Sequence, residues 1–449
     1  MSAVADRRTP LRRGLRWLLK ATLRFAARIY FRRLITVGEP AADTAGRLFA
    51  ANHFNGIVDP LLILARARYD ASPIAKSTLF KIPVLRSVLG VAEAVPVTRR
   101  KDAPDKSAAD NEKVFEHVAG HLRDGGNILI FPEGVSHDEP HVLPLKTGAA
   151  RMLVLARKEG AKGLTMQAVA LDFDARERFR SRALVTYGPV HAVDEVAAAV
   201  ADDNALVHAL MELIAGDLAR LVVQGESQGE LFLARRVAEL LSNQAQTGTF
   251  ANQIEIAREV VQKAHALGAD DPRYRAVVES VSAYSVALSI AGLSDRQIAH
   301  GRSLTLPRLL HGLWLTLLLP FSILGAVLFF VPYRLPRLAS RLAHGEIDVL
   351  STYKLGIGMV AFPTWLVLLL VATCQMTASP LARLLAMALV PICAYAALIW
   401  VDRLDDRRGS RLAHQASRSG QTQLAALAEL RARALAAIGA ARARADGSD

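Results

Sequence analysis

The chain has 449 residues, of which 52% are hydrophobic, and it carries a net charge of +13 with a mean hydropathy of +0.23. A basic chain can bind nucleic acid or an anionic membrane surface, but no nucleic-acid motif or aromatic-interleaved basic patch is present. The long apolar segments therefore favour a membrane protein of two or three units. Two cysteines, Cys374 and Cys393, are too few for a disulfide framework.

Residues 1–36 are expected to form a basic amphipathic helix. Cations recur at every fourth position with apolar side chains between them: Arg12, Arg16, Lys20, Arg24, Arg28 and Arg32. This spacing predicts a helix whose faces differ in polarity, and a charge in every turn excludes a membrane span. We expect it to lie in the interface of an anionic bilayer, where each cation contributes about 1 kcal/mol. The alternative is a solvated basic helix packed on the next domain.

Residues 37–223 are predicted to form an α/β domain. Six short apolar runs indicate strands, at 47–51, 72–76, 92–97, 127–131, 166–172 and 183–187. Helical periodicity separates them at 107–124 and 146–158, and residues 194–223 form a closing helix. Alternating strands and helices predict a largely parallel sheet flanked by helices.

A histidine and an aspartate follow the first predicted strand, in the stretch Asn-His-Phe-Asn-Gly-Ile-Val-Asp-Pro at 52–60. Six residues of ideal helix turn by about 600°, so His53 and Asp59 meet only if the chain bends. Asn55-Gly56 is a local means of bending it. A carboxylate bound to one imidazole nitrogen fixes the tautomer and leaves the other nitrogen basic. The alternative is a hydrogen bond that only stabilises the turn.

A second polar loop, Phe-Pro-Glu-Gly-Val-Ser-His-Asp at 131–138, follows the predicted strand at 127–131. Both loops lie at strand ends, where α/β sheets usually carry their sites. Ser136 lacks the Gly-x-Ser-x-Gly context of a serine hydrolase. No metal signature or glycine-rich phosphate loop is present.

With these loops the sequence resembles the membrane-bound glycerophospholipid acyltransferases, over residues 25–223. The family's four blocks correspond, in order and spacing, to His53 and Asp59, residues 96–99, residues 131–134 with Ser136, and residues 169–171. Five residues separate His53 from Asp59 where most members have four, and this form is similar to the fungal glycerol-3-phosphate acyltransferases. Ala168 stands where the last block usually has proline.

The resemblance implies transfer of a fatty acyl group from a thioester, acyl-CoA or acyl carrier protein, to a glycerol hydroxyl, with no cofactor, metal or acyl-enzyme. His53 is the expected base and Asp59 its orienting partner. Acceptor phosphate and glycerol are expected at Arg99, Arg100, Glu133, Gly134, Ser136 and Lys146, with support from Asn52, Asn55 and Pro132. For the arginine pair, the alternative is a solvated basic turn.

Glycerol 3-phosphate is the expected acceptor. A lysophospholipid such as lysophosphatidate is the alternative, and a non-catalytic lipid-binding scaffold is the alternative from another class.

Residues 224–304 are predicted to form a helical insert, and 403–449 an Ala/Arg-rich helical tail. Between them, residues 305–402 hold apolar segments at 311–331, 355–374 and 384–401, long enough for membrane helices. Flanking arginines favour a cytoplasmic location for both ends of 355–401 and for the catalytic domain. The first segment, with Pro320, is then expected to re-enter rather than span. Buried core helices are the alternative.

Overall fold

The structure, a computed structural model, describes residues 9–40, 46–66, 70–98, 107–300, 306–342, 347–377, 379–419 and 421–445. The chain divides into two compact units, each described separately below. The α/β unit comprises residues 1–226 together with 346–352, and the helical unit comprises 227–345 and 353–449.

A seven-stranded sheet forms the centre of the α/β unit, in the order β1-β7-β6-β2-β5-β3-β4. The strands are β1 (Phe31–Val37), β2 (Arg47–Ala51), β3 (Ser72–Lys76), β4 (Val95–Val97), β5 (Asn127–Ile130), β6 (Thr165–Phe173) and β7 (Ser181–Ala192). Neighbours run parallel except β6 and β7, which are antiparallel. The predicted, largely parallel sheet is therefore confirmed.

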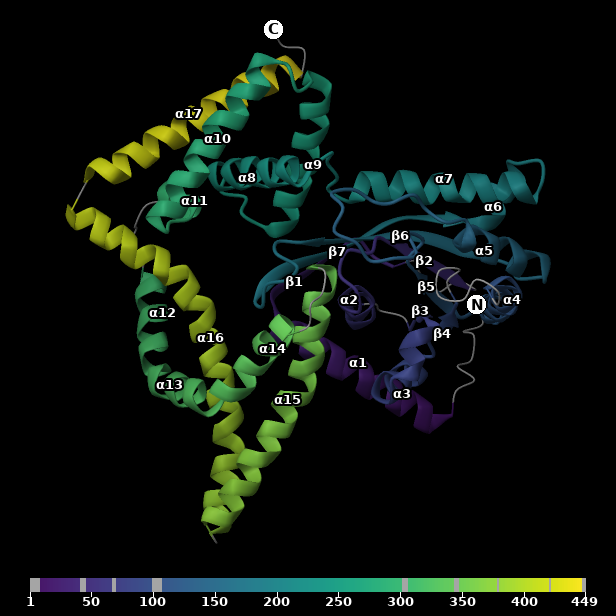
Figure 1. The fold of residues 1–449 in the computed structure, drawn as a ribbon, viewed down its shortest axis with the longest axis horizontal. Coiled ribbons are helices and arrows are strands. Elements are labelled where there is room, and N and C mark those ends of the chain that lie inside the picture. Colours follow the sequence, from purple (N-terminus) through teal and green to yellow (C-terminus); the bar gives the residue numbers. More distant parts are fainter. Residues whose placement is uncertain are drawn as a thin grey trace. The chain divides into compact units, whose positions relative to one another are not determined.

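Helices cover both faces of this sheet (Figure 1). They are α1 (Pro10–Tyr30), α2 (Val58–Arg66), α3 (Pro83–Val91), α4 (Ser107–Arg123), α5 (Gly148–Lys158), α6 (Val193–Ala198) and α7 (Asp203–Leu221), with a 3₁₀ turn at Ser77–Lys81. Helices α4, α5 and α7 contribute to the main core with strand residues such as Leu48, Ile128 and Met166. Every residue of β6 is buried, as expected for a strand covered on both faces.

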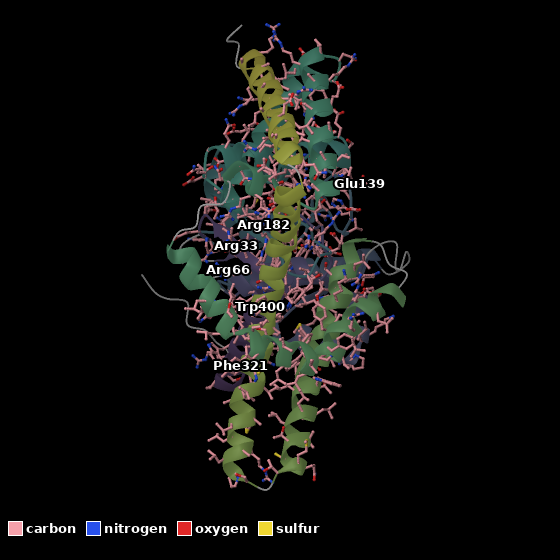
Figure 2. All side chains as sticks on the ribbon, turned by 90° about the vertical axis from the view of Figure 1, so that its left-hand side faces the viewer. Arg33, Arg66, Glu139, Arg182, Phe321 and Trp400 are labelled. Atoms are coloured by element: carbon pink, nitrogen blue, oxygen red, sulfur yellow. The ribbon has the colours of Figure 1, made fainter. Side chains whose placement is uncertain are left out.

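Two elements of this unit differ from the sequence prediction. The N-terminal helix ends at Tyr30, and the following residues form β1, which pairs with β7 from Phe31 to Val37. Arg33 and Arg182 are partners in that pairing and are labelled in Figure 2. The single closing helix is instead two, α6 and α7, because the Asp202 side chain caps α7 by accepting from Ala205 N at 2.8 Å.

Three cations of α1 bind the protein rather than face away from it. Arg16 is 5% exposed and pairs with Asp70 at 3.2 Å and Glu93 at 2.7 Å. Lys20 pairs with the same aspartate at 2.8 Å, and Arg24 donates to the Ala65 carbonyl at 2.9 Å. For the buried Arg16, contact with an anionic bilayer is wrong, because acidic groups distant in sequence pair with it. For Lys20 and Arg24, contact with a bilayer stays a prediction.

Several apolar side chains of α1 are exposed. Trp17 is 70% exposed, Phe25 68%, Leu18 56% and Leu11 72%. Interfacial binding of residues 1–36 therefore stays a prediction, now resting on apolar side chains.

A cluster of helices forms the first part of the helical unit: α8 (Gln228–Gln244), α9 (Phe250–Leu267), α10 (Pro272–Ala291), α11 (Asp295–His300) and α17 (Gln421–Ala445). Its buried core includes Val237, Val281, Tyr284 and Ile438. The buried Asp295 carboxylate accepts from Asn243, Tyr284 and Arg431, each at 2.8 Å. The predicted insert and the end of the predicted tail thus share one core.

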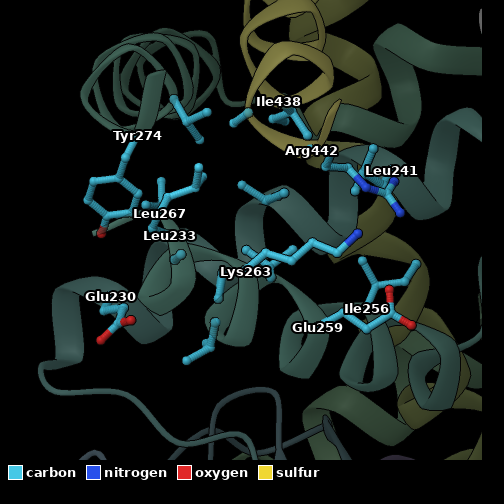
Figure 3. A pocket seen from close by; sticks show the side chains of 17 residues that line it. Glu230, Leu233, Leu241, Ile256, Glu259, Lys263, Leu267, Tyr274, Ile438 and Arg442 are labelled. Atoms are coloured by element: carbon cyan, nitrogen blue, oxygen red, sulfur yellow. The ribbon is translucent and has the colours of Figure 1, made fainter. Parts of the chain in front are cut away.

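Helices α8, α9, α10 and α17 line a partly open pocket. Its wall is apolar, with Leu233, Leu241, Leu267 and Ile438 among the side chains in Figure 3, and charged residues such as Lys263 and Arg442 lie among them. None of the residues predicted for the active site lines this pocket.

The apolar segments form α12 (Leu306–Leu317), α13 (Leu319–Leu328), α14 (Phe330–Leu342), α15 (Ile347–Met376) and α16 (Pro380–Ser419). Within the described residues, two helices are long and apolar enough to span a membrane, at Leu350–Met376 and Pro380–Asp402. Helices α13 and α14 form a bent apolar pair, with an angle of 53° between the two helices. The bend fits either a broken span or a re-entrant loop, so re-entry of 311–331 stays a prediction.

Close packing joins α13 to α16. A Cβ atom added to Gly325 would lie 2.0 Å from the Cys393 carbonyl oxygen, and Ser322 donates to the Ala396 carbonyl at 3.1 Å. Trp400, labelled in Figure 2, donates from Nε1 to the Leu315 carbonyl at 3.1 Å. Small residues at such contacts are typical of helices that pack in membranes.

Candidate active site

The two polar loops meet because their strands are neighbours. β2 and β5 run parallel, with Ala50 opposite Ile130, so both chains leave the sheet at the same edge. The His53 ring stacks on the Phe131 ring, with centroids 4.2 Å apart and planes inclined by 24°. The loop residues 53–59 and 131–138 therefore form one site.

His53 and Asp59 are paired as the sequence predicted. Nδ1 of His53 lies 3.0 Å from Oδ2 of Asp59, and the Asn55 N–H donates to the same oxygen at 2.7 Å. Gly56 adopts a φ of 41° in the intervening turn, a conformation that favours glycine. For Nε2 of His53, no hydrogen-bond partner is found among the described residues. This nitrogen is available to accept a proton.

The Asp59 carboxylate is shielded from solvent. It is fully buried in the first turn of α2. Burial raises its pKa, while His53, the Asn55 N–H and the charge of Arg176 oppose that rise in part. The contact with Nδ1 fixes the orientation of the imidazole ring.

Glu133 connects the loops through its buried carboxylate. Oε1 accepts from the His53 backbone N–H at 2.6 Å, and Oε2 accepts from the Leu143 N–H at 2.8 Å and from His137 Nε2. These contacts show that Glu133 fixes the backbone of the candidate base. Its expected binding to the acceptor glycerol stays a prediction.

Lys146 lies against the Phe-Pro-Glu-Gly loop. The backbone N–H of Lys146 donates to the Pro132 carbonyl at 2.9 Å. A Cβ atom on Gly134 would lie 2.3 Å from Nζ of Lys146. Gly134, with a φ of 76°, thus makes room for this cation. Lys146 has no ion-pair partner within the described part of the chain. Its ammonium is a candidate ligand for an acceptor phosphate.

The remaining predicted residues divide into three groups. Asn52 is buried and bonds both the N–H and the carbonyl of Leu171, at 2.8 and 3.0 Å, which ties the end of β2 to the fourth family block in β6. Ser136 lies half-buried in the second loop. Arg99 and Arg100 lie outside the described residues, so their role stays a prediction.

Arg176 is a connecting residue that sequence reasoning missed. Its Nη1 donates to the Phe54 carbonyl at 2.9 Å and the His137 carbonyl at 3.2 Å, and it forms an ion pair with Asp138. It therefore joins the loop after β2 to the loop after β5. It belongs to an arginine-rich stretch after β6, and nothing in its spacing distinguished it from the neighbouring arginines.

Within the described residues, no group of three or more His, Cys, Asp or Glu side chains is placed to hold a metal ion. His137 binds Glu133 through Nε2 and accepts from the Glu139 N–H through Nδ1 at 3.2 Å. Its two nitrogens serve the loop.

Two parts of the chain match models of known protein families. Residues 33–172 match the model described as Acyltransferase, and residues 233–435 match that of the glycerol-3-phosphate acyltransferase 2 C-terminal domain. The first contains both polar loops. The second contains most of the helical unit, including the greater part of α17.

Two curated relatives come from Saccharomyces cerevisiae. The chain is 25% identical to glycerol-3-phosphate O-acyltransferase 2 over 336 residues, covering 70% of this chain and 44% of that protein. It is 26% identical to glycerol-3-phosphate O-acyltransferase 1 over 271 residues, covering 56% and 36%. The chain thus spans less than half the length of these relatives.

Among solved structures, the 1-acyl-sn-glycerophosphate acyltransferase PlsC of Thermotoga maritima matches 48% of this chain and 84% of its own, at 16% identity and a TM-score of 0.35.

Proposed function

We propose that this chain, which carries an acyltransferase domain followed by a C-terminal domain of the glycerol-3-phosphate acyltransferase 2 type, is a glycerol-3-phosphate 1-O-acyltransferase of phospholipid synthesis. The observation that carries the proposal is the His53–Asp59 pair at 3.0 Å, held in place by the Glu133 carboxylate. The named activity of the yeast relatives supports glycerol 3-phosphate as the acceptor.

The reaction uses His53 as a general base. Nε2 takes the proton of the acceptor hydroxyl while that oxygen attacks the thioester carbonyl carbon. The C–S bond then breaks, and the imidazolium returns its proton to the leaving thiolate. A positioned base contributes about 10² to 10⁴ in rate, and Asp59 keeps the imidazole in the tautomer that exposes Nε2.

The acceptor phosphate binds to cations near the loops. Lys146 supplies one, because its ammonium lies against Gly134 and has no ion-pair partner in the described chain. Arg99 and Arg100 follow β4 and would add paired N–H donors suited to phosphate. These cations orient the glycerol so that its primary hydroxyl faces His53.

The acyl donor is an acyl thioester of coenzyme A or of acyl carrier protein, and no cofactor is required, since a thioester is already activated. The two apolar helices anchor the protein in the membrane, and the catalytic domain faces the cytoplasm. Protease protection of the α/β unit in sealed vesicles whose cytoplasmic face points outward would contradict that orientation.

A substrate panel tests the proposal. The purified full-length protein in lipid vesicles is given each donor class with radiolabelled glycerol 3-phosphate or lysophosphatidate. We expect glycerol 3-phosphate to become a 1-acyl product with at least one donor. Acylation of the lysolipid alone would reassign the acceptor, and binding of both acceptors without transfer would leave only a scaffold.

A further inference from the structure

A third segment of the chain reaches the candidate active site. Residues 346–352 lie far along the sequence but belong to the α/β unit, and they include the first turn of α15. The same helix continues into the candidate membrane span Leu350–Met376. Two hydroxyl side chains in the second turn of that helix, Ser351 and Thr352, bond the site.

Thr352 bonds the turn between His53 and Asp59. Its Oγ1 accepts from the Ile57 backbone N–H at 3.1 Å. Ile57 directly precedes α2, where backbone N–H groups lack partners within the helix. The two residues that follow it are bound within the turn, since the N–H groups of residues 58 and 59 donate to the Asn55 carbonyl at 2.9 and 3.4 Å. Thr352 thus completes the bonding of the turn that sets the His53–Asp59 separation.

Ser351 bonds the residue that joins the two loops. It is fully buried, and its Oγ donates to the Arg176 carbonyl. The same carbonyl accepts from Asn55 Nδ2 at 3.4 Å, while the Arg176 guanidinium bonds the Phe54 and His137 carbonyls. One buried hydroxyl therefore supports a residue that contacts both polar loops.

From these contacts we infer that Ser351 and Thr352 are positioning residues for the acyl transfer, through which the start of a membrane helix holds the His53–Asp59 turn in its reactive shape. The inference rests on the proposed function for its kinetic test only. Neither hydroxyl touches a reacting atom. Their effect is transmitted through Ile57 and Arg176, so it falls on the geometry of the base rather than on substrate binding.

Four substitutions test this in the full-length protein in vesicles. Thr352→Val removes the acceptor while keeping the side-chain shape, and Thr352→Ser keeps the hydroxyl. Thr373→Val is the matched control on the same helix, because Thr373 Oγ1 bonds only its own helix, at the Leu369 carbonyl 2.8 Å away. We expect Thr352→Val to lower kcat about tenfold with little change in KM, the size expected for one buried hydrogen-bond partner.

The conservative variant separates positioning from general stability. Thr352→Ser should restore most of the wild-type kcat, and Thr373→Val should match wild type. Ser351→Ala should behave like Thr352→Val, with a melting temperature close to that of the control. Equal kcat in Thr352→Val and Thr373→Val would overturn the inference.

Hydrogen–deuterium exchange gives a readout that does not depend on activity. The Ile57 amide should exchange about tenfold faster in Thr352→Val than in Thr373→Val, since its acceptor is gone. Unchanged exchange would overturn the inference even in an active enzyme. Faster exchange in a protein that acylates no acceptor would sustain the structural link and reject the proposed function.

Discussion

Glu133→Gln is the substitution that best separates a structural role from a substrate-binding role in the second loop. The carboxylate accepts from the His53 N–H at 2.6 Å, the Leu143 N–H at 2.8 Å and His137. A glutamine has one acceptor oxygen, so its amide nitrogen must face at least one of these donors. The variant therefore removes a charge and leaves a buried donor without a partner.

The magnitude follows from those contacts. A buried donor without a partner costs about 1–3 kcal/mol, and each of the other two bonds weakens by about 1 kcal/mol when its acceptor becomes neutral. The total is about 3–5 kcal/mol. At about 2–4 °C per kcal/mol for a unit of this size, the melting temperature should fall by at least about 6 °C. Because His53 loses its backbone anchor, kcat should fall by about 10².

Thermal unfolding and steady-state kinetics measure both effects, with Glu139→Gln as the control. Glu139 is exposed on the same loop and is labelled in Figure 2, so its variant should match wild type in both assays. If Glu133→Gln raised only KM for the acceptor, with kcat and melting temperature unchanged, Glu133 would be a substrate ligand and our reasoning would be refuted.

Four further predictions follow from the same structure. Burial raises the Asp59 pKa, so the stability that this carboxyl group contributes is lost as pH rises above about 4, and the melting temperature of Asp59→Asn minus that of wild type should increase with pH from there; a constant difference would contradict this. The substitutions Trp17→Glu and Phe25→Glu, at two exposed positions of α1, should weaken binding to vesicles in a flotation assay. They should not lower the melting temperature of the α/β unit. Gly325→Leu should separate α13 from α16 and abolish a cysteine crosslink engineered between them, whereas Gly312→Ala should not. Arg431→Ala should destabilise the helical unit by about 3–5 kcal/mol in denaturant titration, because it leaves the buried Asp295 charge without its cation.

The parts of the site that sequence reasoning predicted are those with local signals. A buried apolar strand followed by a polar, glycine-containing loop marks both motifs, and the parallel sheet then brings His53 beside Phe131. The bend between His53 and Asp59 was predicted because Asn55-Gly56 permits it. In each case the deciding residues are neighbours along the chain.

The parts that were missed depend on partners distant in sequence. Arg16 of α1 is satisfied by Asp70, 54 residues away, and no helical periodicity distinguishes that arrangement from a face bound to lipid. Arg176 connects the loops through backbone carbonyls, which every residue carries. The sequence predicts no role for the tail, because Arg431 contacts Asp295 only when α11 and α17 pack together.

The central claim is that His53, oriented by Asp59, removes the acceptor proton. The most direct measurement compares the single-turnover rate of acyl transfer to glycerol 3-phosphate in wild type and His53→Ala, alongside equilibrium binding of the acceptor. We predict a rate about 10² to 10⁴ lower with binding retained. An undiminished rate in the variant would contradict the account.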